Sequence, residues 1–338
     1  MKILILGVNG FIGHNLLNRA LKDTDWQIYG IDIGSDRLGN LINNPRFHFI
    51  KGDITVNGKW VERHIKRSDV VIPLVAIATP SVYIKNPVKI FELDFEENVK
   101  VIRQCVKYKK RLIFPSTSEV YGMCPDKEFD EDTSNLVLGP IKNHRWIYSC
   151  CKQLLDRIIW AYGIEKDLKF TIIRPYNWIG PKLDSMHSDK EGSPRVITQF
   201  MSALIDGTPI YLVNGGRQRR SFTDVEDGID CLVRIIKDDR KNCDKQIFNI
   251  GNPQNDISIK GLACKMRSIF LKSSVLKKRK KISDIVEISG DDFYGKGYQD
   301  VKFRIPSIKR AEKLLGWKPK ISLDATLKKT IKFYLADE

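Results

Sequence analysis

Lys2-Ile3-Leu4-Ile5-Leu6-Gly7-Val8-Asn9-Gly10-Phe11-Ile12-Gly13 is the stretch that decides the fold. An apolar run, typical of a buried strand, passes directly into three glycines, and an amphipathic segment from His14 to about Lys22 predicts a helix. Strand, glycine turn and helix in this order are the context in which such glycines bind a dinucleotide. Gly7 would allow the tight turn, Gly10 the approach of a pyrophosphate, and Gly13 close packing of helix on strand.

An acidic residue closes the second predicted strand, 27–33, about 20 residues beyond the glycines. In a dinucleotide-binding fold, Asp32 at this place would accept hydrogen bonds from the adenosine ribose and repel a 2′-phosphate, which favours NAD over NADP. Arg37 lies nearby and weakens that preference, and Asp32 could also be a simple turn residue. Asp53 and Ile54 follow the third strand and are placed to lie along the adenine. The predicted cofactor-binding residues are Gly7, Asn9, Gly10, Phe11, Ile12, Gly13, Asp32, Asp53, Ile54, Tyr148 and Lys152.

Strands and helices alternate through the first half of the chain, which predicts an α/β fold with a doubly wound parallel sheet. The long helix 87–109 is expected to bury Phe91, Leu93, Val99, Ile102 and Val106. We expect a mainly NAD-binding Rossmann domain over 1–175 and a smaller, mainly substrate-binding α/β domain over 176–338, with 225–250 returning to the first. Further strands are predicted at 47–51, 69–74, 111–114 and 170–174, and further helices near 195–206, 225–237, 258–271, 308–315 and 324–335.

Composition restricts the class of protein. The chain has 338 residues, 42% hydrophobic and 29% charged, with no apolar run long enough to span a membrane, so a soluble cytoplasmic protein without a signal peptide is expected. Seven scattered cysteines predict reduced thiols and no metal site. The net charge of +16 is compatible with nucleic acid or an anionic substrate. Its densest run, 277–281, lacks interleaved aromatics and is interpreted as a solvated loop, so no nucleic-acid partner is expected.

A second motif supplies candidate catalytic groups. The strand 111–114 leads into Pro115-Ser116-Thr117-Ser118-Glu119-Val120-Tyr121-Gly122, and further on Tyr148 and Lys152 stand four residues apart. On a helix, that spacing places both side chains on one face. An ammonium favours a neighbouring phenolate, and a hydroxyl from Thr117 or Ser118 can orient a substrate alcohol, so these groups could remove a proton while hydride leaves the same carbon. Taken alone, the Tyr–Lys pair could equally be an ordinary pair on an amphipathic helix.

These motifs together resemble the extended short-chain dehydrogenases that act on nucleotide sugars. The resemblance runs essentially end to end and is strongest to the UDP-glucuronic acid decarboxylase domains of ArnA-type bifunctional polymyxin-resistance proteins. Those proteins also carry an N-terminal formyltransferase domain, whereas this chain begins at the first strand, so a separate formyltransferase is one expected partner. The segments that carry the resemblance are 75–80, 91–98, 114–124, 145–148 and 294–301, together with Arg174-Pro175 and Asn177.

The resemblance implies NAD-dependent oxidative decarboxylation of UDP-glucuronic acid to a UDP-4-keto-pentose, on the route to aminoarabinose-modified lipid A and antibiotic resistance. It assigns a role in decarboxylation to Glu119, whose pKa a substrate carboxylate would raise, and places Arg304 beside that carboxylate. From local sequence alone, Glu119 could be a loop residue and Arg304 a surface residue. The implied catalytic residues are Thr117, Ser118, Glu119, Tyr148, Lys152 and Arg304.

Substrate binding is expected from two sources. Arg217 and Arg220, beside two glycines, suit a diphosphate because guanidinium matches phosphate oxygens in paired hydrogen bonds, although composition alone would describe a basic loop. The resemblance completes the set, which reads Ala78, Tyr83, Thr117, Ser118, Arg145, Asn177, Tyr211, Arg217, Gln218, Arg220 and Tyr298.

Several alternatives stay open at this point. A UDP-xylose or UDP-apiose/xylose synthase would share the first steps and reuse the NADH, and a nucleotide-sugar epimerase or dehydratase would share the fold. A cofactor-binding regulator without catalysis would not need the full set of catalytic residues. The resemblance implies a homo-oligomer, since relatives commonly pair through helices of the dinucleotide domain, and the candidate helices here are 91–109 and 146–162.

Overall fold

A seven-stranded parallel sheet forms the centre of the computed structural model, which describes residues 1–184, 195–273, 283–295 and 298–336. Its strand order reverses beside β1, as in a doubly wound α/β fold, so the predicted fold class is confirmed. In spatial order the strands are β11 (Gln246–Ile250), β6 (Phe170–Pro175), β5 (Arg111–Pro115), β4 (Val70–Pro73), β1 (Lys2–Leu6), β2 (Gln27–Asp32) and β3 (Phe47–Lys51).

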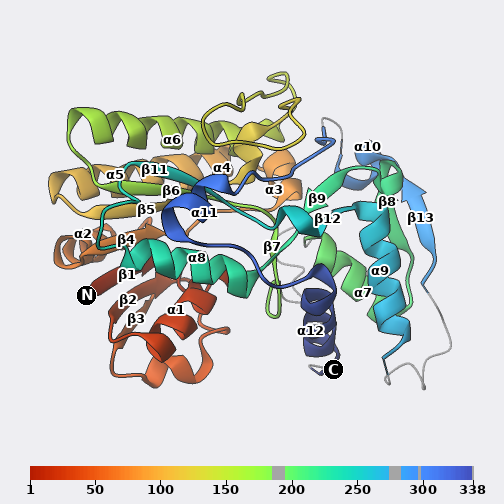
Figure 1. Cartoon of the computed structure of the whole chain (residues 1–338), viewed down its shortest axis with the longest axis horizontal. Coiled ribbons are helices and arrows are strands. Elements are labelled where there is room, and N and C mark those ends of the chain that lie inside the picture. The colour runs from red at the N-terminus through yellow and green to blue at the C-terminus, as the bar shows by residue number, and fades with distance from the viewer. Residues whose placement is uncertain (185–194, 274–282, 296–297, 337–338) are drawn as a thin grey trace.

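Helices cover both faces of the sheet, which explains why the central strands β1 and β4 carry uninterrupted apolar runs (Figure 1). In β1, Ile3 and Ile5 contribute to one hydrophobic cluster, while Leu4 and Leu6 contribute to the other. The first cluster includes α1 (Phe11–Asp23) and α8 (Val225–Lys237), with α11 (Lys309–Leu315) beside α8. The second includes α2 (Gly58–Arg67), α5 (Asn98–Lys107) and α6 (Trp146–Glu165). The segment 225–250 thus supplies both a helix and the edge strand β11.

The long helix predicted at 87–109 contains a π-helical segment that changes which residues are buried. It consists of α4 (Pro87–Ile90), the π-helix η2 (Phe91–Glu97) and α5. The wider turn shifts the helical phase, so Phe91 is 39% exposed whereas Asp94 is 0% exposed. The expectation that Phe91 lies on the buried face is therefore wrong, because a regular 3.6-residue period does not hold across this segment.

The remaining elements form a smaller lobe beside the carboxyl ends of the strands (Figure 1). Three two-stranded pairings join β7 to β10, β9 to β12 and β8 to β13, and α10 contacts α3 of the sheet lobe. The strands are β7 (Trp178–Ile179), β8 (Ile210–Val213), β9 (Arg219–Ser221), β10 (Thr223–Asp224), β12 (Asp256–Ser258) and β13 (Ile285–Ile288). The helices of the smaller lobe are α7 (Val196–Asp206), α9 (Ile259–Leu271), α10 (Gly290–Tyr294) and α12 (Leu323–Ala336), and its short 3₁₀ turns are η5 (Asn214–Gly216) and η6 (Pro253–Asn255). The sheet lobe also contains α3 (Pro80–Lys85) and the 3₁₀ turns η1 (Gly39–Asn43) and η3 (Ser118–Tyr121).

Composition led to expectations about cysteines, membrane spans and metal sites. All seven cysteines are free thiols. Within the described ranges, no helix is long and apolar enough to cross a membrane, and no group of three metal-ligating side chains gathers. The basic run at 277–281 lies outside the described residues.

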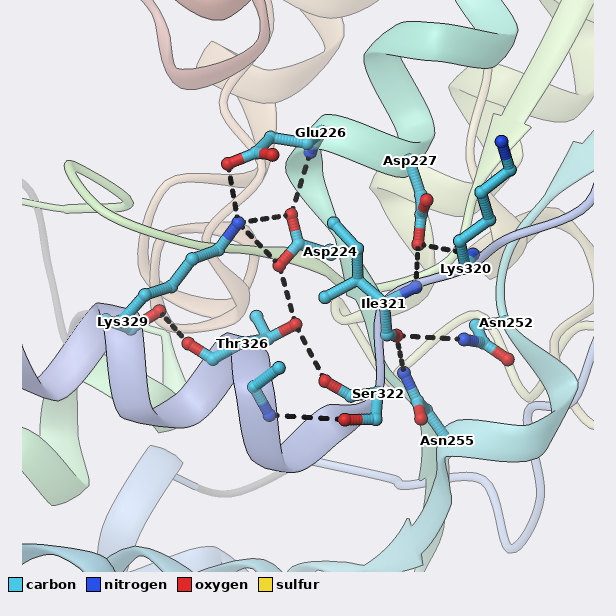
Figure 2. A network of polar contacts seen from close by, with 12 residues as sticks. Asp224, Glu226, Asp227, Asn252, Asn255, Lys320, Ile321, Ser322, Thr326 and Lys329 are labelled. Atoms are coloured by element: carbon cyan, nitrogen blue, oxygen red, sulfur yellow. Dashed lines mark hydrogen bonds and ion pairs between the residues drawn. The ribbon is translucent and has the colours of Figure 1, made fainter.

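A polar network fixes the C-terminal helix α12 to the start of α8 (Figure 2). The Asp224 carboxylate accepts hydrogen bonds from Thr326 Oγ1 at 2.6 Å and from Lys329 Nζ at 2.8 Å, and it caps α8 by accepting from the Glu226 amide at 2.9 Å. Asp227 Oδ2 accepts from the Ile321 amide at 2.9 Å. Because Asp224 is buried, these contacts compensate for the hydration that its carboxylate loses on folding.

We expect Asp224→Ala to lower the free energy of unfolding by about 2–3 kcal/mol, since it removes a helix cap and the buried partner of Thr326 and of the partly exposed Lys329. The matched control is Glu226→Gln, which alters the exposed second partner of Lys329 and should cost less than about 1 kcal/mol. Urea denaturation at pH 7 measures both. Equal losses in the two variants would contradict the role given to Asp224.

Candidate active site

The glycine turn between β1 and α1 has the shape that a pyrophosphate requires. Gly7 has a φ of +87°, a conformation that favours glycine, and its amide donates to Ile31 O at 2.9 Å. A Cβ atom on Gly13 would lie 2.4 Å from Gly7 O and 2.8 Å from the Val8 backbone. Helix and strand therefore meet here backbone to backbone, and the amino end of α1 is directed at the space above the turn. This cradle fits a dinucleotide.

Asp32 lies at the end of β2 beside this turn. Its carboxylate accepts from the Asn9 amide at 2.8 Å and from the Gly34 amide at 3.2 Å. Burial raises the pKa of Asp32, although these hydrogen bonds oppose the shift. Arg37 donates from its amide to Asn9 Oδ1 at 2.9 Å and from its guanidinium to Lys182 O at 3.2 Å. The first interaction holds the turn residue Asn9, and the second joins Arg37 to the segment at Lys182. Neither uses the Asp32 carboxylate, which can therefore accept hydrogen bonds from ribose hydroxyls.

The other predicted cofactor residues differ in exposure. Phe11 and Ile54 are buried among hydrophobic side chains, and Ile12 packs against the same cluster as Phe11. Asp53 is exposed, and its carboxylate accepts from the amide and hydroxyl of Thr55, each at 2.9 Å. Asp53 thus stabilises the turn after β3, and its side chain faces solvent.

The turn after β5 carries the predicted catalytic hydroxyls. Ser116 is held by its hydroxyl, which donates to Asp156 Oδ2 on α6 at 2.9 Å. Thr117 caps the 3₁₀ turn η3, because its Oγ1 accepts from the Glu119 amide at 3.2 Å. Ser118 is buried next to it. The strand end therefore presents Thr117, Ser118 and Glu119 in a fixed turn toward α6.

Tyr148 and Lys152 lie one turn apart on α6, both buried. The Tyr148 ring stacks on Tyr83 with centroids 4.8 Å apart, and Lys152 Nζ lies 6.0 Å from the Tyr148 ring centroid. The ammonium donates to Pro115 O at 2.9 Å. Burial raises the pKa of Tyr148 above its ordinary value, and a hydrogen bond with Thr117 lowers it in part. In this state the phenol is protonated, whereas the sequence led us to expect that Lys152 would favour a phenolate.

Glu119 is held between two arginines from distant parts of the chain. Its Oε2 accepts from Arg145 at 2.6 Å and its Oε1 from Arg304 at 2.8 Å. Burial would raise the pKa of Glu119, but the two guanidinium groups outweigh burial and hold that pKa well below its ordinary range. A raised pKa, as expected beside a substrate carboxylate, is therefore not found in this state. Arg145 and Arg304 are themselves buried, so the three side chains form a compact charged cluster.

The predicted UDP-binding arginines differ from one another. Arg217 is exposed after η5, whereas Arg220 is buried in β9 and forms an ion pair with Asp300. Arg220 also donates to Val301 O at 2.9 Å. Burial lowers the pKa of Arg220, and Asp300 opposes this. A diphosphate at Arg220 would thus meet a guanidinium that already has an anionic partner.

The other predicted substrate residues differ in their surroundings. Tyr298 stacks on Tyr294 with centroids 4.2 Å apart, and Asn177 Nδ2 donates to Ser221 O at 2.9 Å. Ala78 and Tyr211 are exposed, and Gln218 is half-buried. The site thus combines buried charges with accessible aromatic and small side chains.

Sequence reasoning did not single out two acids in this region. Asp300 pairs with Arg220, and Asp94 of η2 is buried near Lys152, as their mutual effects on pKa show. Both lie in segments that carry the family resemblance. Nothing in local sequence reveals their partners, because each partner is distant along the chain.

Comparison with known proteins agrees with this geometry. The model of the NAD dependent epimerase/dehydratase family matches residues 3–251. The crystal structure of the PbgP3 protein from Burkholderia pseudomallei is 49% identical, with a TM-score of 0.90, and the match covers 99% of this chain and 97% of that one. The chain belongs to the NAD dependent epimerase/dehydratase family, and the predicted cofactor, NAD, is that of the family.

More distant structures share the fold. A UDP-glucuronic acid 4-epimerase from Bacillus cereus, in complex with UDP-glucuronic acid and NAD, is 22% identical with a TM-score of 0.80, and the match covers 100% of both chains. A dTDP-glucose 4,6-dehydratase from Bacillus anthracis, in complex with NAD, is 21% identical with a TM-score of 0.80, over 100% of this chain and 97% of that one. At these identities the likeness concerns the fold alone.

Gly13→Ala should weaken NAD binding by about 10- to 100-fold, since the added methyl group must displace the backbone of the glycine turn. Gly58→Ala is the control, because its Cβ would meet nothing within 4 Å. Calorimetric titration with NAD gives both dissociation constants. An unchanged affinity in the Gly13 variant would show that the turn does not hold the cofactor.

Glu119→Gln should lower the free energy of unfolding by about 3 kcal/mol at pH 7, because two buried guanidinium groups lose their shared anion. The folded-state pKa lies below the unfolded value of about 4.3, so the carboxylate stabilises the fold fully above that pH and progressively less below it. The difference from the wild type should therefore shrink on acidification. Glu128→Gln, at an exposed acid, is the control, and an identical pH dependence in both variants would refute the prediction.

Proposed function

We propose that this protein is an NAD-dependent decarboxylating dehydrogenase of UDP-glucuronic acid, whose product is a UDP-4-keto-pentose. The observation that carries the proposal is the buried cluster of Glu119 with Arg145 and Arg304. A uronate needs a cationic partner, and Arg145 Nε is a buried donor without a hydrogen-bond partner among the described residues. An epimerase acting on a neutral sugar has no use for this donor capacity.

Oxidation at C4 is assigned to the groups between β5 and α6. Tyr148 takes the hydroxyl proton, and Thr117 and Ser118 orient that hydroxyl against it. Lys152 lies one helical turn away and stabilises the negative charge that develops on the phenol. Bound NAD supplies the acceptor for the hydride from C4, held by the glycine turn and by Asp32.

Loss of CO2 is assigned to the charged cluster. Once C4 is a ketone, the uronate carboxylate is β to a carbonyl and its C–C bond can break, leaving an enolate. Arg304 positions the carboxylate and stabilises the enolate, and it relays a proton to carbon through water. Glu119 keeps both arginines in place and disfavours the ionised ground state of the substrate. Arg217 and Arg220 bind the diphosphate, with Tyr298, Asn177, Tyr211, Gln218, Ala78 and Tyr83 around the nucleotide sugar.

The cellular setting follows from the family resemblance and belongs to the same proposal. The product would feed aminoarabinose modification of lipid A in the cytoplasm, together with a separate formyltransferase. A homo-oligomer is supported by exposed apolar side chains on neighbouring helices, namely Val88, Phe91, Leu154, Trp160 and Ile164.

The deciding experiment mixes the protein with UDP-glucuronic acid and NAD and follows NADH absorbance and CO2 together. We expect both to rise in step. CO2 without net NADH would identify a xylose-forming synthase that reuses its NADH, and a UDP-galacturonate product without CO2 would identify a 4-epimerase. The absence of NADH, of CO2 and of any altered UDP-sugar would contradict action on this substrate.

Two variants separate the half-reactions. Tyr148→Phe should slow NADH formation by about 10²- to 10⁴-fold while UDP still binds. Arg304→Met should abolish CO2 release and also leave UDP binding intact. Tyr108→Phe, whose hydroxyl donates to Glu62 at 2.6 Å outside the site, is the control and should retain full activity. Normal CO2 yield from the Arg304 variant would remove Arg304 from the mechanism.

A further inference from the structure

Asp94 is a buried acid to which the proposed chemistry gives no role. It lies in the π-helix η2, whose wider turn directs it inward, and Asn98 Nδ2 donates to its backbone carbonyl at 3.0 Å. A buried carboxyl group is costly unless its charge and hydrogen bonds are balanced. A π-helical turn that buries an acid beside the catalytic helix therefore calls for an explanation, and such turns often occur at functional sites.

The contacts of Asp94 connect two walls of the site. Its Oδ1 accepts from the Ile77 amide at 2.9 Å, and Ile77 lies in the loop between β4 and α3 that also carries Ala78. Its Oδ2 is buried without a hydrogen-bond partner in the described part of the chain. The segment η2 itself packs against α6, which carries Tyr148 and Lys152. One oxygen thus fixes the loop, while the other is free to act electrostatically.

Lys152 needs an anionic neighbour, since its side chain is 1% exposed. Two acids act on its charge, Asp94 and Asp156. Asp156 is already engaged, because its Oδ2 accepts from Ser116 at 2.9 Å and from Arg174 at 3.1 Å. Among the described residues no ion pair joins Asp94 to an arginine, so its charge, unlike that of Asp156, is not shared with a guanidinium group.

We propose that Asp94 is a positioning residue that sets the ionisation of the Tyr148–Lys152 pair and holds the Ile77 loop against it, an inference that rests on the proposed role of that pair. The charge of Asp94 acts on the pKa values of Lys152, Tyr148 and Cys151 of α6 and of Tyr83 of α3. The other charges that act on the Tyr148–Lys152 pair are those of Glu119, Arg304 and Asp156. Burial raises the pKa of Asp94 to about 7, against the opposing effects of Lys152 and the Ile77 amide.

The sign of the effect follows from charge. An ionised Asp94 opposes a phenolate, so it raises the pKa of Tyr148, and it favours the ammonium form of Lys152. Removing this charge should let Tyr148 lose its proton at lower pH. Asp94→Asn isolates the charge, because its amide oxygen can still accept from Ile77 and its volume is nearly unchanged.

The first test is the pH dependence of NADH formation in the wild type, Asp94→Asn and Glu96→Gln, the last at an exposed acid of the same segment. We expect the acidic limb of the Asn variant to move to lower pH by about one unit, a change typical of a nearby charge. The Gln variant should follow the wild type. An unchanged limb, or one moved to higher pH, would overturn the proposal, since a purely structural role would lower activity at every pH alike.

The second test needs no catalysis and uses the unliganded wild type. In protein labelled with ¹³C-aspartate, the Asp94 Cγ resonance, assigned through its backbone amide, should titrate near pH 7, far above the ordinary value of about 3.9. Lys152→Met should raise this midpoint, because the Lys152 ammonium lowers the pKa of Asp94. A midpoint near 4, or one that does not change in Lys152→Met, would refute the inference even if UDP-glucuronic acid proves to be the substrate. A midpoint near pH 7 that rises in Lys152→Met would support it even if the substrate proves to be another sugar.

Discussion

The carboxylate of Glu119, shared by two buried arginines, is the interaction on which the rest of the site depends. Arg145 precedes α6, Glu119 follows β5, and Arg304 comes from the C-terminal part of the chain, so one acid joins three segments. Each charge is buried and would be costly alone, which means that all three must be in place together. The same cluster acts on the pKa of Tyr148, which Glu119 raises and Arg304 lowers.

Local sequence patterns predicted most helices, strands and turns, but they did not predict which distant side chains contact one another. The glycine turn after β1 and the pairing of Tyr148 with Lys152 on one helix follow from backbone geometry within a few residues, so sequence reveals them. The π-helical turn at Phe91–Glu97 does not, because a regular helical period predicted Phe91 inside and gave no role to Asp94. Partners such as Arg304 for Glu119, 185 residues away, depend on tertiary packing that only the family resemblance could indicate.

Charge compensation within the smaller lobe affects which anions could bind there. Asp300 pairs with Arg220 and is itself buried; burial would raise its pKa, but Arg220, Arg145 and Arg304 hold it below the ordinary value. An acid that stays ionised beside the predicted diphosphate site makes weakly charged anions poor competitors. A ligand with several phosphate oxygens can accept paired hydrogen bonds from Arg220. We therefore expect a diphosphate to bind here more tightly than an anion with a single charge.

The return of residues 225–250 to the sheet means that neither lobe is a continuous piece of chain. The sheet acquires its edge strand β11 only after much of the smaller lobe has been made, and β6 would otherwise present an unpaired edge. A polypeptide emerging from the ribosome therefore cannot close its nucleotide-binding half until about residue 250 is free. We therefore expect the two lobes to fold together as one cooperative unit. Dividing the chain between them would yield no fragment that contains a complete lobe.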